Sequence, residues 1–310
     1  MTRKLATWAR FCLVNLILFV CAAAHGTSSL DSRKPLIDSL LDLDREYAVT
    51  ETRSPRPFLE AHAQRVHACG TPRVEIVEQW FRCALDALLG VDGLKPSPDP
   101  NSLVANSATS ALSSHEGSCA ALVAAVLALT EPFGEPFDAA VLRDHVVLGL
   151  RSAPGVYFEV LEGGRQLNNL DLRRHRMPPG GKPTRVLGHE YLAYYLDNLA
   201  ARLADGGDTA KAERALVKAL EIAPKSGRVH YNYGTLLLRT ERFKAAEAHL
   251  KLAIRLGWDD ADAWVSRGVA VWKLGRLRGA ERSFEKALAR EPGNQRATSN
   301  LAALRNETAR

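Results

Sequence analysis

The sequence lacks the short motifs that mark the common metal, nucleotide and cofactor sites. It contains no H-E-x-x-H, no C-x-x-C, no phosphate-binding G-K-[ST] and no G-x-G-x-x-G after a predicted strand. Cysteine is scarce, and the five cysteines and nine histidines are not clustered at the short spacings that a structural zinc site requires. We therefore expect no metal and no cofactor.

The excess of positive charge is also small. The 41 basic and 35 acidic residues give a net charge of +6. Arg3, Lys4 and Arg10 lie in the first 24 residues, which contain no acidic residue, so the rest of the chain carries 38 minus 35, or +3. A charge this close to balance gives little support to a nucleic-acid partner, and we expect none.

Residues 1–24 have the pattern of a secretory signal peptide. Basic residues precede an apolar run from Phe11 to Val20, and the small residues Ala22 to Ala24 follow it. The run is shorter than the roughly 20 residues that span a bilayer. We expect a cleaved signal and a periplasmic or secreted protein; a retained N-terminal anchor is the alternative, and would be the chain's contact with a membrane.

The C-terminal part carries an internal repeat with a period of 34 residues. Small and bulky apolar residues recur in register, and each unit reads as two helices that cross closely at the small residues. This pattern resembles the tetratricopeptide repeat, over about 193–294 with a further helix from Gln295 to Leu304. Arrays of such repeats form a groove that takes a protein or peptide partner. The recurring positions are Ala212, Ala246 and Ala280; Ala219, Ala253 and Ala287; Leu216, Leu250 and Phe284; and Ala200, Gly234, Gly268 and Ala302; the candidate groove residues are Asn198, Asn232, Tyr233 and Arg267.

Upstream of the repeats the pattern predicts a mixed domain. Residues 33–90 favour helices, and the run from Cys119 to Leu129 is apolar on every face, which is typical of a buried helix. Three short β-favouring runs follow between about 138 and 162. The predicted organisation is a signal at 1–24, this domain at 25–170, a linker at 171–188, and three repeats with a capping helix at 189–310.

One set of residues in the mixed domain has the order of a cysteine-nucleophile site. Cys119 follows Gly117 and Ser118 at a predicted helix N-terminus, where the helix dipole stabilises a thiolate. His145, at the start of a strand, can act as base and acid toward it. Glu159, inside the next strand, can orient the imidazole.

These residues and their flanks resemble the transglutaminase-like superfamily. The segments that carry the resemblance are SHEGSC with the apolar helix after it, DHVVLGL, and VYFEVLEGG, within 113–165. The resemblance implies a papain-like α+β fold in which Cys119 is the nucleophile, His145 the base, and Glu159 the orienting acid. It also implies peptide hydrolysis or acyl transfer, although bacterial branches without an assigned activity exist.

The acid of the set differs from the family pattern, and a second histidine lies near the cysteine. Glu159 stands where the family usually has the shorter Asp, so Glu162 is a second candidate for the orienting role. His115 lies four residues before Cys119, and we interpret it as a loop residue.

Cys69 and Cys83 are candidates for a disulfide. Cleavage of the signal would remove Cys12 and Cys21 and leave three cysteines. A bridge between Cys69 and Cys83 would leave Cys119 unpaired, as a nucleophile must be; two separate buried thiols are the alternative.

The leading interpretation is an exported cysteine enzyme. It would attack an amide of a protein or peptide through a Cys119 thioester, followed by hydrolysis or acyl transfer, with a protein partner held by the repeats. The alternative is a non-catalytic periplasmic scaffold with a degenerate transglutaminase-like domain.

Overall fold

The computed structural model describes residues 34–47, 56–70, 77–90, 93–102, 104–114, 116–134, 136–143, 145–175 and 182–308. The expected signal peptide and His115 lie outside these residues. Within the described part, no helix has both the length and the apolar character needed to cross a membrane.

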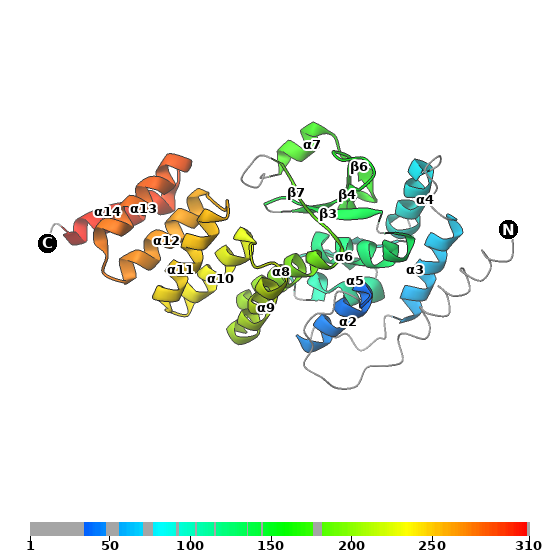
Figure 1. Ribbon diagram of the computed structural model, residues 1–310, viewed down its shortest axis with the longest axis horizontal. Helices are drawn as coiled ribbons and strands as arrows, with labels where there is room; N and C mark the ends of the chain where they lie inside the picture. The colour runs from blue at the N-terminus through cyan, green and yellow to red at the C-terminus, as the bar shows by residue number, and fades with distance from the viewer. Residues whose placement is uncertain are drawn as a thin grey trace.

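The chain combines a first part of helices and strands with a second part made of helices alone (Figure 1). Helices of the first part are α2 (Leu36–Glu46), α3 (Arg56–Ala68), α4 (Val77–Leu89), α5 (Ala108–Ser114), α6 (Cys119–Thr130) and α7 (Asn169–Arg174). Its strands are β1 (Lys95–Pro96), β2 (Glu116–Gly117), β3 (Phe137–Val141), β4 (Val146–Leu150), β5 (Tyr157–Glu159), β6 (Arg165–Gln166) and β7 (Thr184–Val186). Short 3-10 turns are η3 (Val104–Asn106), η4 (Glu131–Phe133), η5 (Val160–Glu162) and η6 (Gly188–Glu190).

Helix α6 is the central element of the first part. Every residue from Ala120 to Thr130 is buried, as expected for a helix that is apolar on all faces. It contacts strands β3 and β4 as well as helices α5 and α2. The Ser118 side chain caps the helix by accepting the Ala121 N–H at 3.3 Å, so the helix begins at Cys119.

The main sheet has five antiparallel strands in the order β6-β5-β4-β3-β7. Strands β3, β4 and β5 are the three expected from the sequence. Strand β7 corrects the prediction of a linker at 171–188, because it pairs with β3 in the register Ala140↔Arg185. The Arg185 guanidinium binds the buried Asp138 carboxylate (Nε–Oδ2 2.7 Å), which anchors this edge strand. Strand β7 has three residues, which is too short for a β-strand pattern to be recognised in the sequence.

The second part contains the predicted helix pairs and a final helix. Ala212, Ala246 and Ala280 are fully buried at equivalent positions. A Cβ atom on Gly268 would lie 2.4 Å from Phe284, so only glycine permits this close crossing. The helices are α8 (Tyr191–Asp205) with α9 (Thr209–Ile222), α10 (Gly227–Arg239) with α11 (Phe243–Arg255), α12 (Ala261–Lys273) with α13 (Leu277–Arg290), and the last helix α14 (Gln295–Thr308).

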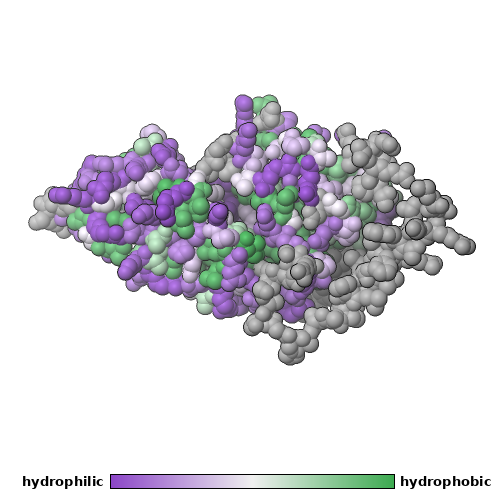
Figure 2. Space-filling model, in the orientation of Figure 1, coloured by the Kyte–Doolittle hydropathy of each residue, from purple (hydrophilic) through white to green (hydrophobic). Residues whose placement is uncertain are grey.

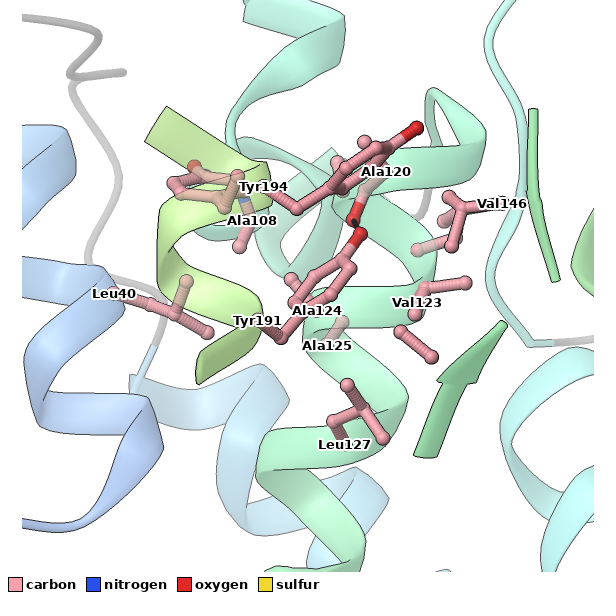
Figure 3. Close-up of a cluster of buried hydrophobic side chains, with 14 of the residues drawn as sticks. Leu40, Ala108, Ala120, Val123, Ala124, Ala125, Leu127, Val146, Tyr191 and Tyr194 are labelled. Carbon is pink, nitrogen blue, oxygen red and sulfur yellow. Dashed lines mark hydrogen bonds between the residues drawn. The ribbon is translucent and has the colours of Figure 1, made fainter. Parts of the chain in front are cut away.

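Helix α8 joins the two parts, because it belongs to both cores. One hydrophobic cluster runs from Leu36 in α2 to Leu236 in α10 and includes residues of α6 and α8. The Tyr191 hydroxyl donates to the Ala120 carbonyl, and the Tyr195 hydroxyl accepts the Ala108 N–H, each at 2.8 Å. Figure 3 shows Tyr191 of α8 packed against α6. The first repeat is therefore packed into the mixed domain.

Candidate functional site

Cys119 is the accessible residue of an otherwise buried helix. It opens α6 and is partly exposed, whereas Ala120 and the rest of the helix are buried. Ser118 fixes this end of the helix: its N–H donates to Ala105 O at 2.7 Å and its hydroxyl donates to Asn106 Oδ1 at 3.0 Å. As the first residue of the helix, Cys119 has an N–H with no acceptor inside the helix.

His145 lies between Cys119 and Glu159. It stands immediately before β4 and is buried, and its Nε2 lies 2.8 Å from Glu159 Oε2. Cys119 lies near the same imidazole and favours its protonated form. Because Glu159 occupies Nε2, Nδ1 is the ring nitrogen that remains for the sulfur. Glu159 ends β5, and its second oxygen accepts the Leu161 N–H at 3.0 Å, so the carboxylate is held from both sides.

The electrostatics of the site favour a charged His145–Glu159 pair. Burial lowers the pKa of His145, but hydrogen bonds and negative charge from Cys119 and Glu159 outweigh burial and raise the pKa to about 10. Burial likewise raises the pKa of Glu159, but the hydrogen bond and charge of His145, with the Leu161 N–H, hold it below its usual value. The imidazole is therefore an imidazolium at neutral pH.

Replacing Glu159 by Gln is expected to lower the pKa of His145 well below 10, because a neutral amide does not stabilise the imidazolium. In the native chain the folded pKa exceeds the ordinary 6.5, so His145 contributes stability below pH 6.5 that is lost as the pH rises toward 10. Titration of the His145 ring resonances by NMR checks this. An unchanged pKa in E159Q would contradict the ion pair.

A second histidine, His175, completes the cluster and was missed in the sequence. Its ring stacks on that of His145 with centroids 4.5 Å apart and planes 17° apart. It lies 16 residues after Glu159, beyond α7, in the stretch that the sequence predicts to be a linker. Its charge adds to the lowering of the pKa of Glu159. Only the fold brings it to the site.

The cluster contains residue types that bind metals, but its two imidazole rings do not point toward one common position. Ligand atoms of His145, Glu159 and His175 all lie within 4.8 Å of one another. An imidazole lone pair lies in the plane of its ring, so two nearly parallel stacked rings do not point at one ion. The rings as placed fit a stacked pair better than two ligands of one metal.

The other sequence candidates lie away from the cluster. Glu162 is exposed and pairs with Arg165, so it does not take the orienting role at His145. Cys69 and Cys83 are joined in a disulfide that links the end of α3 to α4 (Cα–Cα 5.8 Å). Among the described residues, Cys119 is the free cysteine.

The residues proposed for the repeat groove form hydrogen bonds with neighbouring residues. Asn198 donates to Tyr194 O at 3.0 Å, and Tyr233 donates to Glu213 at 2.8 Å. Asn232 donates to Asp197 at 2.7 Å. Arg267 differs, because besides its bond to Ser283 it lines a cavity of about 170 Å³. That cavity lies between α12 and α13 and is lined by Trp264, Arg267, Gly279, Arg282 and Lys286.

Comparison with known proteins identifies the repeats. Two tetratricopeptide-repeat family profiles match residues 203–266 and 262–307. The mouse RNA polymerase II-associated protein 3 is 31% identical over 91 residues, which are 29% of this chain and 14% of that protein. The chain therefore spans a small part of that relative's length.

Solved structures similar to the chain are also repeat domains. They include the first repeat domain of human RPAP3 (25% identity, 39% of this chain and 94% of that chain, TM-score 0.38). Another is the repeat domain of Arabidopsis OM64 (22% identity, 39% and 99%, TM-score 0.38). From the profile matches, residues 203–307 are tetratricopeptide repeats.

Proposed function

We propose that this protein is a cysteine enzyme of the transglutaminase-like type that acts on an amide bond of a protein or peptide. The observation that carries the proposal is the His145–Glu159 pair (Nε2–Oε2 2.8 Å) together with Cys119, the partly exposed first residue of a buried central helix packed on an antiparallel sheet. This is the arrangement that the resemblance of the sequence implies, and Glu159 takes the acid position.

The chemistry proceeds in two steps. The Cys119 thiolate attacks the amide carbonyl carbon, and the Cys119 N–H stabilises the resulting oxyanion. The His145 imidazolium gives its proton to the leaving amine as the C–N bond breaks, which leaves a thioester and a neutral imidazole. The neutral His145 then takes a proton from water, the hydroxide attacks the thioester, and the carboxylic acid leaves as the thiolate reforms. With an amine in place of water, the product is a new amide.

In an exported protein, one pair of cysteines can form a lasting disulfide while a third cysteine stays reactive. The proposed signal at residues 1–24 would direct the chain to an oxidising compartment, where a disulfide such as Cys69–Cys83 persists. The bridge leaves Cys119 without a partner cysteine. We therefore place the enzyme in the periplasm or outside the cell.

We further propose that the repeats hold a protein or peptide partner. Residues 203–307 match a family built from stacked helix pairs, and such arrays offer an extended surface for peptides. Most of the face of the repeats seen in Figure 2 is hydrophilic, with smaller hydrophobic areas between. This favours a partner recognised through polar contacts, with a few apolar side chains as anchors.

The test is the pH dependence of iodoacetamide alkylation at Cys119 in the folded protein, read by peptide mass spectrometry. If the imidazolium activates the sulfur as proposed, the rate should fall less than threefold between pH 8 and pH 6. An ordinary thiol loses about tenfold per unit below pH 8.5. A rate that follows the ordinary thiol would overturn the enzyme proposal.

The second candidate is a non-catalytic scaffold, and the placement of cavities favours it. Cavities of about 170 Å³ and about 370 Å³ lie in the repeats, whereas the Cys119 thiol is only partly exposed. In this case the repeats would bind the partner and the Cys119 domain would serve as a second contact. An ordinary alkylation profile together with partner capture by the full chain would establish it.

A further inference from the structure

The turn that carries His145 is fastened to the repeats. Arg143 lies in this turn between β3 and β4, two residues before His145. Its backbone carbonyl accepts a hydrogen bond from Arg228 Nη1 of α10 at 3.0 Å. Its own guanidinium pairs with Asp260 and, at 3.3 Å, with Asp262 of α12. The same guanidinium lies 5.4 Å from the ring centroid of Trp258. Two helices of the repeat array therefore hold the turn.

Arg228 is itself fixed in a buried polar network. Its Nε donates to Asp197 Oδ2 at 2.7 Å, and Asp197 is fully buried in α8. Asn232 donates to the other oxygen of Asp197, also at 2.7 Å. The guanidinium lies 4.6 Å from the ring centroid of Tyr194. Arg228 of α10 therefore binds groups of both α8 and the His145 turn, and it links these three segments.

The same network reaches the Cys119 end of α6. Tyr194 lies beside Ala120 in Figure 3, and Tyr191 donates to Ala120 O at 2.8 Å. Burial lowers the pKa of Arg228, but the charges of Tyr194, Asp197 and Cys119 outweigh burial and raise it. Arg228 therefore stays charged and lies close enough to feel the charge of Cys119.

We propose that the repeat array completes the Cys119 site, with Arg228 as a positioning residue that holds the His145 turn against the start of α6. The proposal rests on the proposed function. Cys119 and His145 come from separate segments, and neither the helix nor the turn alone fixes the distance between the sulfur and the imidazole. Helix α8 contacts the start of α6, helix α10 contacts the turn, and the Arg228–Asp197 pair joins the two helices, so together they fix that distance.

The test is the alkylation profile of Arg228→Lys in the full chain. Lysine keeps a positive charge beside Asp197, so no buried carboxylate is left unpaired, but it loses the planar fork that also reaches Arg143 O. We expect the alkylation rate of Cys119 at pH 6 to fall about tenfold, with less than a threefold change at pH 9. A purely structural role would lower the melting temperature and leave this pH dependence unchanged.

Two further variants keep the test decisive. Arg242→Lys weakens a bidentate pair with Glu213 inside the repeats, far from the turn, and should keep the wild-type profile. Arg143→Ala removes the pairs with Asp260 and Asp262 and should also lower the alkylation rate of Cys119 at pH 6. This variant replaces R228K in the test if R228K does not fold. A folded R228K with the wild-type profile overturns the inference. A wild-type protein without reactivity at pH 6 instead overturns the proposed function.

Discussion

At pH 6, His145→Ala is expected to lower the alkylation rate of Cys119 by about 100-fold. The imidazolium of His145 places a positive charge beside the sulfur, and its raised pKa of about 10 means that this charge is present throughout the range from pH 6 to 9. An ordinary cysteine thiol is about 0.3% ionised at pH 6, and the greater nucleophilicity of its more basic thiolate offsets part of the loss in rate. Near pH 9 the two proteins should differ by only a few-fold.

The matched control for H145A is His249→Ala. His249 lies in α11, where it contacts His230 rather than any group of the Cys119 site. Burial and the charge of His230 lower the pKa of His249, so removing it takes no fixed positive charge from the molecule at neutral pH. H249A should keep the wild-type profile. Equal rates for H145A and wild type at pH 6 would show that His145 does not activate the sulfur.

The repeats could be predicted in detail because their signal is local and periodic. Each 34-residue unit places small residues at one crossing, and the structure buries Ala212, Ala246 and Ala280 there. Tight contact between Gly268 and Phe284 follows from the same register. A repeating pattern predicts how its units pack, because the neighbour of each unit is another copy of that unit.

The candidate site could be predicted only where its residues flank recognisable elements. Cys119 opens an apolar helix and Glu159 ends a β-favouring run, so both were visible in the sequence. His175 and Arg228 were not, since each reaches the site from an element whose own pattern indicates something else: a basic loop for His175, a repeat helix for Arg228. Their contacts depend on tertiary placement, which local periodicity does not encode.

The boundary between the two parts was predicted too sharply for the same reason. The Pro- and Gly-containing stretch before 188 indicated a linker, yet it contains β7, held by three residue pairs with β3 and by the Arg185–Asp138 ion pair. Tyr191 and Tyr195 of α8 anchor the helix to α6 and α5. One continuous core therefore carries the candidate site and the first repeat together.

Loss of the disulfide between Cys69 and Cys83 is expected to lower the free energy of unfolding by about 3 kcal/mol. The bridge closes a loop of sequence separation 14, and a loop of this size restricts the unfolded chain by about that amount in the entropic model. The variant C69A/C83A, measured by denaturant unfolding under oxidising conditions, should show this loss. Reduction of the wild-type protein should give a similar loss.

Cys119→Ala is the control for the double variant. It removes a partly exposed thiol that forms no bridge, so its effect on the free energy of unfolding should stay within about 1 kcal/mol. Peptide mapping without reduction identifies the pairing independently. A map that links Cys69 to Cys119 would contradict both the bridge and the free nucleophile. With Cys69 and Cys83 linked, Cys119 is the cysteine of the described residues that alkylation of the unreduced protein reaches, so the stability and reactivity experiments measure separate cysteines.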